Sequence, residues 1–209
     1  EPRLTLLTLR GIPIRLHRSF LLLGSLYLGM ETWTGGQSGA VNALVLAVLL
    51  FTCVALHELG HAVAARRYGL ETRDITLYPF GGIARLEGRP EPGWPEAAIA
   101  AAGPGVNLAL AILALPLAYH DLPLAWVFVM INLLMGVLNL LPAFPMDGGR
   151  VLRSLLTLRS DEQTATEQSL FLSRILAGLM IVAGIFTHIS VSLVGLALLW
   201  MVRRESAAV

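Results

Sequence analysis

Residues 41–66 read VNALVLAVLLFTCVALHELGHAVAAR, an apolar run that is long enough to cross a bilayer as a helix. Three ionisable side chains, His57, Glu58 and His61, lie near the end of this run. Insertion scales put the cost of each ionisable residue at bilayer depth at about 2.5 kcal/mol or more, so residues of this kind usually mark a functional site. The run therefore combines the composition of a membrane span with the side chains of a reactive centre.

The spacing of these three residues predicts a metal site. Positions i and i+4 lie on the same face of a helix, so His57 and His61 can both bind one metal ion, and Glu58 reaches the space beside it. Two histidines and a glutamate in this pattern are typical of zinc hydrolases. We therefore expect a catalytic zinc ion on the inner part of this helix.

The composition predicts an integral membrane protein. Hydrophobic residues make up 56% of the chain and charged residues 14%, and the mean hydropathy is +0.70. Soluble domains have about 45–50% apolar and about 25% charged residues. We expect an all-α polytopic membrane protein in a single domain, residues 1–209. Six transmembrane helices are expected over about 19–34, 41–66, 96–118, 124–142, 168–187 and 189–202. A net charge of +1 gives no indication of a nucleic-acid partner.

The positions of the basic residues predict the orientation of these spans. The chain has fifteen arginines and no lysine, and with six spans all the arginines fall on one side of the membrane. They are Arg3, Arg10, Arg15, Arg18, Arg66, Arg67, Arg73, Arg85, Arg89, Arg150, Arg153, Arg159, Arg174, Arg203 and Arg204. Because cytoplasmic loops carry the positive excess, both termini are expected in the cytoplasm.

A catalytic zinc ion usually has three protein ligands and one open position, so a third ligand is needed. His61 precedes Arg66 by five residues, which places the histidine pair about 7–8 Å beneath the inner interface. Asp147 follows the fourth expected span at the same inner edge and is the candidate ligand. His120 and His188 lie in outer loops and are excluded. The alternative is that Asp147, which begins an Asp-Gly-Gly sequence, belongs to an ordinary turn.

Two segments outside the apolar runs have the pattern of β-strands. Residues 1–18 are expected to form a β-hairpin, because apolar residues alternate with other types after a turn at Arg10-Gly11. Residues 75–87 also suit strands, and their pair of glycines marks a bend or a close approach of another group. Both segments lie on the arginine-rich side, so we expect a small membrane-associated β-sheet on the cytoplasmic side.

Several stretches resemble one protein family. They are HELGH at 57–61, GPGVN at 103–107 and NLLPAFPMDGGR at 139–150, with GIPIR at 11–15 and FGGIAR at 80–85. Over nearly its whole length the chain resembles the site-2 protease family of intramembrane zinc metalloproteases, and most of all the prokaryotic branch that includes the sporulation factor protease. The resemblance implies one Zn²⁺ per chain, bound by His57, His61 and Asp147, and a location in the plasma membrane of a prokaryotic cell.

The resemblance also implies a reaction. The substrates would be membrane-anchored proteins cut within a transmembrane segment, with zinc activating a water molecule and Glu58 acting as general base. An unwound segment needs a hydrogen-bonding partner in a water-poor place. An exposed sheet edge would supply it by adding the substrate as a strand, through Gly81, Gly82, Ile83, Ala84, Arg85 and Leu86. The alternative is a sheet that merely covers the helices. Members of this branch often carry two regulatory CBS domains after the membrane core, so the resemblance makes CBS domains, which residues 1–209 do not include, a candidate regulatory partner.

Four further polar residues in the apolar runs have alternative interpretations. Asn107 either binds a neighbouring helix, as polar residues in membrane bundles do, or faces the site and donates to the substrate carbonyl oxygen in the transition state. Asn132 and Asn139 are interpreted as residues that hold helices together. Cys53 is one helical turn before the first histidine and is interpreted as a small buried residue rather than a ligand.

Two other functions use the same residues. A metal transporter would pass an ion along several ligands, but the outer half of the predicted bundle has no ionisable relay and a transporter has no need of Glu58. A pseudoprotease would bind transmembrane segments without cutting them. Such a protein would have lost a ligand or the base, and this sequence keeps all of them.

Overall fold

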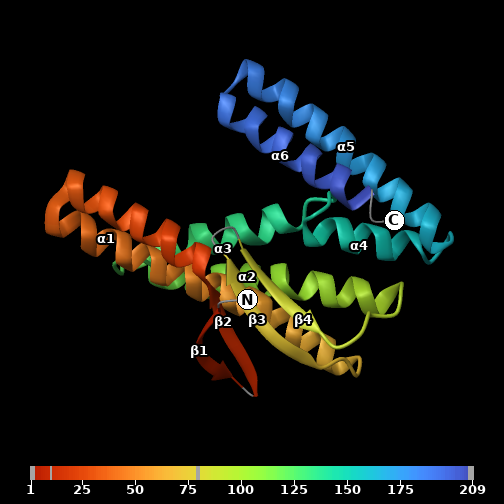
Figure 1. Cartoon of the computed structure of the whole chain (residues 1–209), viewed down its shortest axis with the longest axis horizontal. Coiled ribbons are helices and arrows are strands. Elements are labelled where there is room, and N and C mark those ends of the chain that lie inside the picture. Colours follow the sequence, from red (N-terminus) through yellow and green to blue (C-terminus); the bar gives the residue numbers. More distant parts are fainter. Residues whose placement is uncertain (1–2, 10, 79–80, 207–209) are drawn as a thin grey trace. The chain divides into compact units, whose positions relative to one another are not determined.

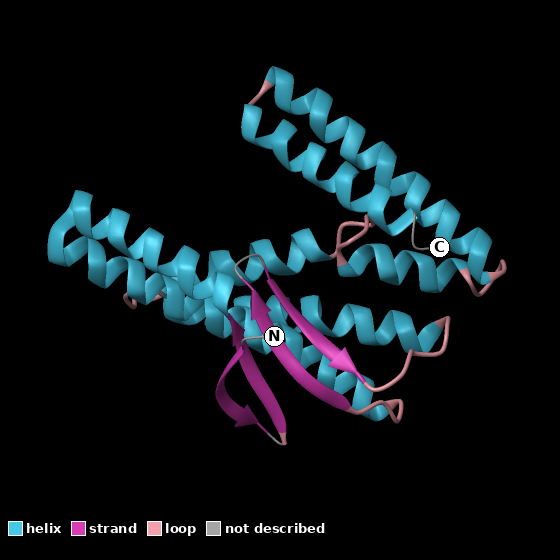
Figure 2. Ribbon diagram, in the orientation of Figure 1, coloured by secondary structure: helices cyan, strands magenta, loops and turns pink. Residues whose placement is uncertain are grey.

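The computed structural model describes residues 3–9, 11–78 and 81–206, mostly as helices with one small sheet (Figures 1 and 2). The elements are β1 (Arg3–Leu9), β2 (Ile12–His17), α1 (Arg18–Arg67), β3 (Thr72–Tyr78), β4 (Gly81–Leu86), α2 (Trp94–Tyr119), α3 (Ala125–Asn139), α4 (Asp147–Leu156), α5 (Glu162–Phe186) and α6 (Ile189–Ser206). Arg10 of the expected turn, and Pro79 and Phe80 of the second expected strand segment, lie outside the described residues.

The helix α1 is a helical hairpin rather than one rod. Gly36 has φ 60° and ψ −143°, which is outside the helical range and is easily adopted only by glycine. Past this bend, a Cβ at Gly39 would lie 2.1 Å from the carbonyl oxygen of Glu31. Farther from the bend, the rings of Phe20 and Phe51 meet edge to face, 4.1 Å apart. The two halves of α1 are therefore antiparallel neighbours, and they correspond to the first two expected spans.

Among the described residues, three helices, α1, α2 and α5, are long and apolar enough to cross a membrane. The helix α3 is apolar but shorter, with 15 residues, and α6 has 18. Each expected span overlaps one of these helices or a half of α1. The agreement reflects the strong hydropathy of the segments. The observed helices differ from the expected spans only at their ends, by several residues.

The helix α4 was not expected. From the sequence, no helix was expected between the fourth and fifth spans, 124–142 and 168–187, whereas the structure begins a ten-residue helix at Asp147. The segment DGGRVLRSLL carries two arginines and two glycines, so it has neither the apolar run of a span nor high helix propensity. Its helical conformation was missed for that reason.

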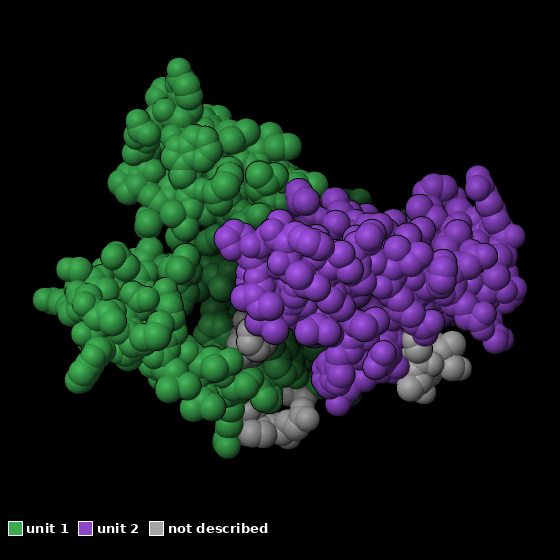
Figure 3. Space-filling view, turned by 90° about the horizontal axis from the view of Figure 1, so that it is seen from above, with its two compact units in different colours: residues 1–89, 105–134 green, residues 90–104, 135–209 purple. Residues whose placement is uncertain are grey.

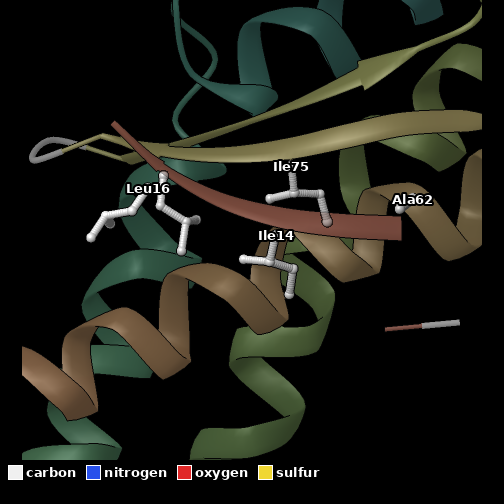
Figure 4. Close-up of a cluster of buried hydrophobic side chains, with 5 residues drawn as sticks. Ile14, Leu16, Ala62 and Ile75 are labelled. Atoms are coloured by element: carbon white, nitrogen blue, oxygen red, sulfur yellow. The ribbon is translucent and has the colours of Figure 1, made fainter. Parts of the chain in front are cut away.

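The four strands form one sheet in the order β1-β2-β3-β4. Pairing is antiparallel except between β2 and β3, which are parallel and connected through α1. One side of the sheet packs on the end of α1 that carries the two histidines (Figure 4). The buried residues of this contact are Ile14, Leu16, Ala62, Ile75 and Leu77. The expected hairpin is confirmed, and the second strand pair begins at Thr72, a few residues earlier than expected.

The described chain divides into two compact units, which Figure 3 colours separately. Unit 1 comprises Glu1–Arg89 and Gly105–Leu134, and unit 2 comprises Pro90–Pro104 and Met135–Val209. Unit 1 holds the α1 hairpin and the sheet. A second apolar cluster in unit 1 joins α2 to α3 through small residues and Val129.

In unit 2, α5 and α6 pack closely at small residues. A Cβ at Gly184 would lie 2.2 Å from the backbone nitrogen of Ser192, and the hydroxyl of Ser192 donates to the carbonyl of Ile181 at 2.8 Å. At the other end of α5, Asp161 caps the helix and accepts from the backbone N–H of Thr164 at 2.9 Å. Hydrogen bonds from the backbone and side chain of Thr164 lower the pKa of Asp161, so the cap keeps its charge to a lower pH than an ordinary aspartate does.

Candidate metal centre

The two histidines of the HELGH sequence point at a common position. The Nε2 atoms of His57 and His61 are 3.1 Å apart, and their ring planes are nearly perpendicular, at 84°. A tetrahedral zinc ion with bonds of about 2.0–2.1 Å holds two nitrogen ligands about 3.3 Å apart. Both side chains are buried, with exposed fractions of 5% and 6%. The pair therefore fits two ligands of one zinc ion.

Glu58 contacts the edge strand of the sheet. Its Oε2 accepts from the backbone N–H of Ala84 in β4 at 3.0 Å. A Cβ at Gly82 would lie 2.4 Å from Cγ of Glu58 and 2.8 Å from its carboxylate carbon. The glutamate can approach the strand because position 82 has no side chain. The glycine pair that the sequence marked as a bend or close approach thus makes room for Glu58.

Asn107, on α2, lies directly behind His57. Its Oδ1 is 2.6 Å from Nδ1 of His57, and its Nδ2 donates to Oδ1 of Asn132 on α3 at 2.8 Å. Both asparagines are completely buried. The amide of Asn132 also donates to the carbonyl oxygen of Phe128 at 2.9 Å and to Sγ of Cys53 at 3.1 Å. Asn132, interpreted from the sequence as a helix-packing residue, is thus connected to the histidine pair.

Asn139 has a different environment from Asn132. Its Nδ2 donates to the carbonyl of Met135 at 3.0 Å, one turn earlier on α3. This bond lies within α3, so the expected role of Asn139 in holding helices together stays a prediction. Both asparagines were assigned the same packing role from the sequence because both lie in the same apolar helix, although Asn139 begins the NLLPAFPMDGGR stretch.

In unit 2, Asp147 is the first residue of α4 and has an exposed fraction of 9%. A carboxylate is favourable here, because the N-terminus of a helix carries a partial positive charge. The guanidinium of Arg150 is 4.0 Å from Oδ1 of Asp147. Asp147 is therefore a helix residue with a fixed backbone direction, not a member of a free turn.

The loop before Asp147 folds tightly around the start of α4. A Cβ at Gly148 would lie 2.3 Å from the carbonyl oxygens of both Leu140 and Leu141, and one at Gly149 would lie 2.6 Å from the backbone nitrogen of Phe144. The N–H of Phe144 donates to the hydroxyl of Ser173 on α5 at 2.9 Å. The two glycines allow the loop to pass over the helix, and this packing sets the direction of the Asp147 backbone.

A partly buried ion pair supports the same loop. Arg153 of α4 donates to Glu96 of α2, and its guanidinium lies over the ring of Phe144 at 5.9 Å from the centroid. Glu96 has an exposed fraction of 5%. Removing the charge of Arg153 would leave Glu96 buried and unpaired, which is strongly destabilising.

Comparison with known proteins gives consistent matches. The model of Peptidase family M50 matches residues 45–122 and 118–183. A zinc metalloprotease of Methanocaldococcus jannaschii is 35% identical over 211 residues, covering 98% of this chain and 60% of that protein. Stage IV sporulation protein FB of Bacillus subtilis is 34% identical over 125 residues, covering 56% of this chain and 41% of that protein. The chain thus spans less than two thirds of the length of these curated relatives.

A solved structure extends this likeness to three dimensions. The site-2 protease from Methanocaldococcus jannaschii matches with a TM-score of 0.70 at 33% identity, covering 98% of this chain and 95% of the solved one. The family model covers the HELGH sequence, the buried asparagines and Asp147. On these matches, the chain belongs to peptidase family M50, the family of the site-2 proteases.

Proposed function

We propose that this chain is an intramembrane zinc metalloprotease that hydrolyses peptide bonds within transmembrane segments of membrane-anchored proteins. The observation that carries the proposal is the arrangement at the inner end of α1. The Nε2 atoms of His57 and His61 converge to 3.1 Å, and the carboxylate of Glu58 is buried beside them. An apolar run such as 41–66 keeps these side chains only at a substantial cost, which a catalytic role accounts for.

The zinc ligands in this proposal are His57, His61 and Asp147. Support comes from the chemistry of the donor set, since two imidazoles and one carboxylate are a common ligand set of catalytic zinc sites. Catalytic zinc sites commonly use three such ligands and leave one position open for water or substrate. Each of the three side chains is largely buried, as a site that excludes bulk water requires.

When bound, the zinc ion would act as a Lewis acid that makes water acidic near neutral pH and polarises the scissile carbonyl. Glu58 would take the proton from the attacking water and return it to the leaving amine. The hydrogen bond from the N–H of Ala84 holds its carboxylate in place at 3.0 Å. Burial of Glu58 keeps the proton transfer away from bulk solvent.

We place the substrate along β4, with backbone contacts over Gly81, Gly82, Ile83, Ala84, Arg85 and Leu86. β4 is at the end of the strand order, so one of its edges pairs with no described strand. The same strand donates an N–H to Glu58, so a substrate added there would lie next to the base. The alternative role, covering α1, is supported by the apolar contact of the sheet with that helix.

For the membrane arrangement we propose six spanning segments, two of them in α1, with both termini in the cytoplasm. The support is the position of the fifteen arginines, which all fall on one side of such an arrangement. With five or seven spans the arginines would be divided between the two faces.

Removal and return of zinc tests the proposed function. Purified protein in liposomes is expected to contain one zinc ion per chain and to cut a single-span substrate within its apolar segment. A chelator should abolish cleavage, and added Zn²⁺ should restore it, because the ligands stay in place on helices. The cleavage position is mapped by mass spectrometry. Full zinc occupancy without cleavage of several substrates would instead favour a protein that binds transmembrane segments.

Gly82→Ala tests the contact between β4 and the base. The new methyl group would lie 2.4 Å from Cγ of Glu58, so the carboxylate must move away from its present position. Misplacement of a reacting group by about 1 Å costs about 10²-fold in rate, and we expect a loss of this size with zinc content unchanged. Initial cleavage rates are compared with those of Gly29→Ala, where nothing lies within 4 Å of the added methyl group. Equal rates for the two variants would show that the contact has no role.

A further inference from the structure

A line of buried hydrogen bonds leads from the backbone of α3 to the first histidine of α1. We infer that Asn132, acting through Asn107, positions His57 for the metal by fixing which of its ring nitrogens carries the proton. This inference rests on the proposed function, since it takes His57 as a zinc ligand. Asn132 is a positioning residue in this scheme and does not touch the reacting atoms.

The first link fixes the orientation of Asn132. Its amide group reaches the carbonyl oxygen of Phe128 at 2.9 Å. A carbonyl oxygen only accepts hydrogen bonds, so the side of Asn132 that faces it must be the NH₂ group. The second contact of this NH₂ group, with Sγ of Cys53 at 3.1 Å, also has an acceptor available. The oxygen of Asn132 is therefore turned towards Asn107.

The second link passes this orientation to the histidine. Because Asn132 offers an oxygen, Asn107 must present its NH₂ group to it, and the two atoms are 2.8 Å apart. The oxygen of Asn107 then faces Nδ1 of His57 at 2.6 Å. An oxygen acceptor requires a protonated Nδ1, so the lone pair of the neutral ring is on Nε2. Nε2 is the atom that lies 3.1 Å from Nε2 of His61.

The backbone carbonyl of Phe128 thus determines, through Asn132 and Asn107, which ring nitrogen of the metal ligand His57 carries the proton. Without Asn132, the amide of Asn107 could turn over and present NH₂ to His57, which would place the proton on the wrong nitrogen. Hydrogen-bonding partners behind metal-binding histidines typically contribute 10–100-fold to metal affinity. Complete burial of both asparagines means that no bulk water replaces the lost contact.

The test uses Asn132→Leu and a double variant that restores an acceptor. Asn132→Leu is expected to weaken zinc affinity by about 10–100-fold, measured by competition with a chelator. The double variant Asn107→Asp with Asn132→Leu is expected to regain most of the affinity. A carboxylate is an acceptor whichever way it turns, so it fixes the histidine without help from residue 132. In the Co²⁺-loaded proteins, the absorption spectrum of Asn132→Leu should differ from that of the wild type, and the spectrum of the double variant should return towards it.

The outcomes separate this inference from its alternatives. Zinc affinity of Asn132→Leu equal to that of the wild type would overturn it. So would a loss that the double variant fails to recover, because that pattern indicates packing alone. Ser169→Ala, which removes a buried hydroxyl bonded to the carbonyl of Ala165, is the control and should bind zinc normally. If Asn132→Leu is not recovered folded, Asn132→Ala takes its place with the same expectations. A wild-type protein that binds no zinc would refute the proposed function itself.

Discussion

Glu58→Gln is expected to lower the cleavage rate by about 10²–10⁴-fold, the range that general-base catalysis contributes, while zinc binding is unchanged. The amide of glutamine has the shape of the carboxylate but does not take a proton from water. Its oxygen can still accept from the N–H of Ala84, as the carboxylate does at 3.0 Å. The substitution therefore removes the proton acceptor and leaves the packing against β4 intact.

The measurement combines zinc content with initial cleavage rates in liposomes. Glu31→Gln is the matched control, because it makes the same chemical change on the same helix α1, near the bend at Gly36. We expect this control to retain zinc and to cut as the wild type does. If Glu58→Gln contained full zinc and cut at a rate close to that of the wild type, Glu58 could not be the base.

The parts of this structure that follow from sequence are those set by local patterns. The histidine spacing placed two imidazoles on one helix face, and the structure brings their Nε2 atoms to 3.1 Å. Alternating residues and a glycine predicted the hairpin of β1 and β2, which is confirmed. Hydropathy located the apolar helices, because a helix that crosses the hydrocarbon core must be apolar over about 20 residues. The two halves of α1 were predicted as separate spans, although α1 contains several glycines and the bend is at only one of them, Gly36.

The missed features depend on contacts between distant segments. Asn132 and His57 are 75 residues apart in sequence and are joined only through Asn107, so no local pattern marks the connection. The sequence left the role of Asn107 open between helix packing and the transition state. The amide in the structure has contacts at both ends, with His57 and with Asn132, which supports the positioning role inferred above.

Gly148→Ala is expected to disrupt the site as severely as loss of a ligand, although it leaves every ligand in the sequence. The new Cβ would lie 2.3 Å from the carbonyl oxygens of Leu140 and Leu141. Both are backbone atoms, so relief requires the loop or the start of α4 to move. Asp147 is the adjacent residue and would move with it. We expect cleavage to fall by at least about 10²-fold, because small displacements at a reacting centre have effects of this size.

Two further measurements identify the cause of that loss. Overpacking typically costs about 1–3 kcal/mol, so Gly148→Ala should unfold at a lower temperature than the wild type. It should also bind zinc more weakly, because the carboxylate of Asp147 is displaced.

Gly178→Ala in α5 of the same unit is the control, since nothing lies within 4 Å of its added methyl group. Alanine in a helix interior is about 1 kcal/mol better than glycine, so the control should be at least as stable as the wild type. Wild-type zinc affinity and cleavage in Gly148→Ala would show that the loop does not fix Asp147, and the tight packing around α4 would then need another explanation.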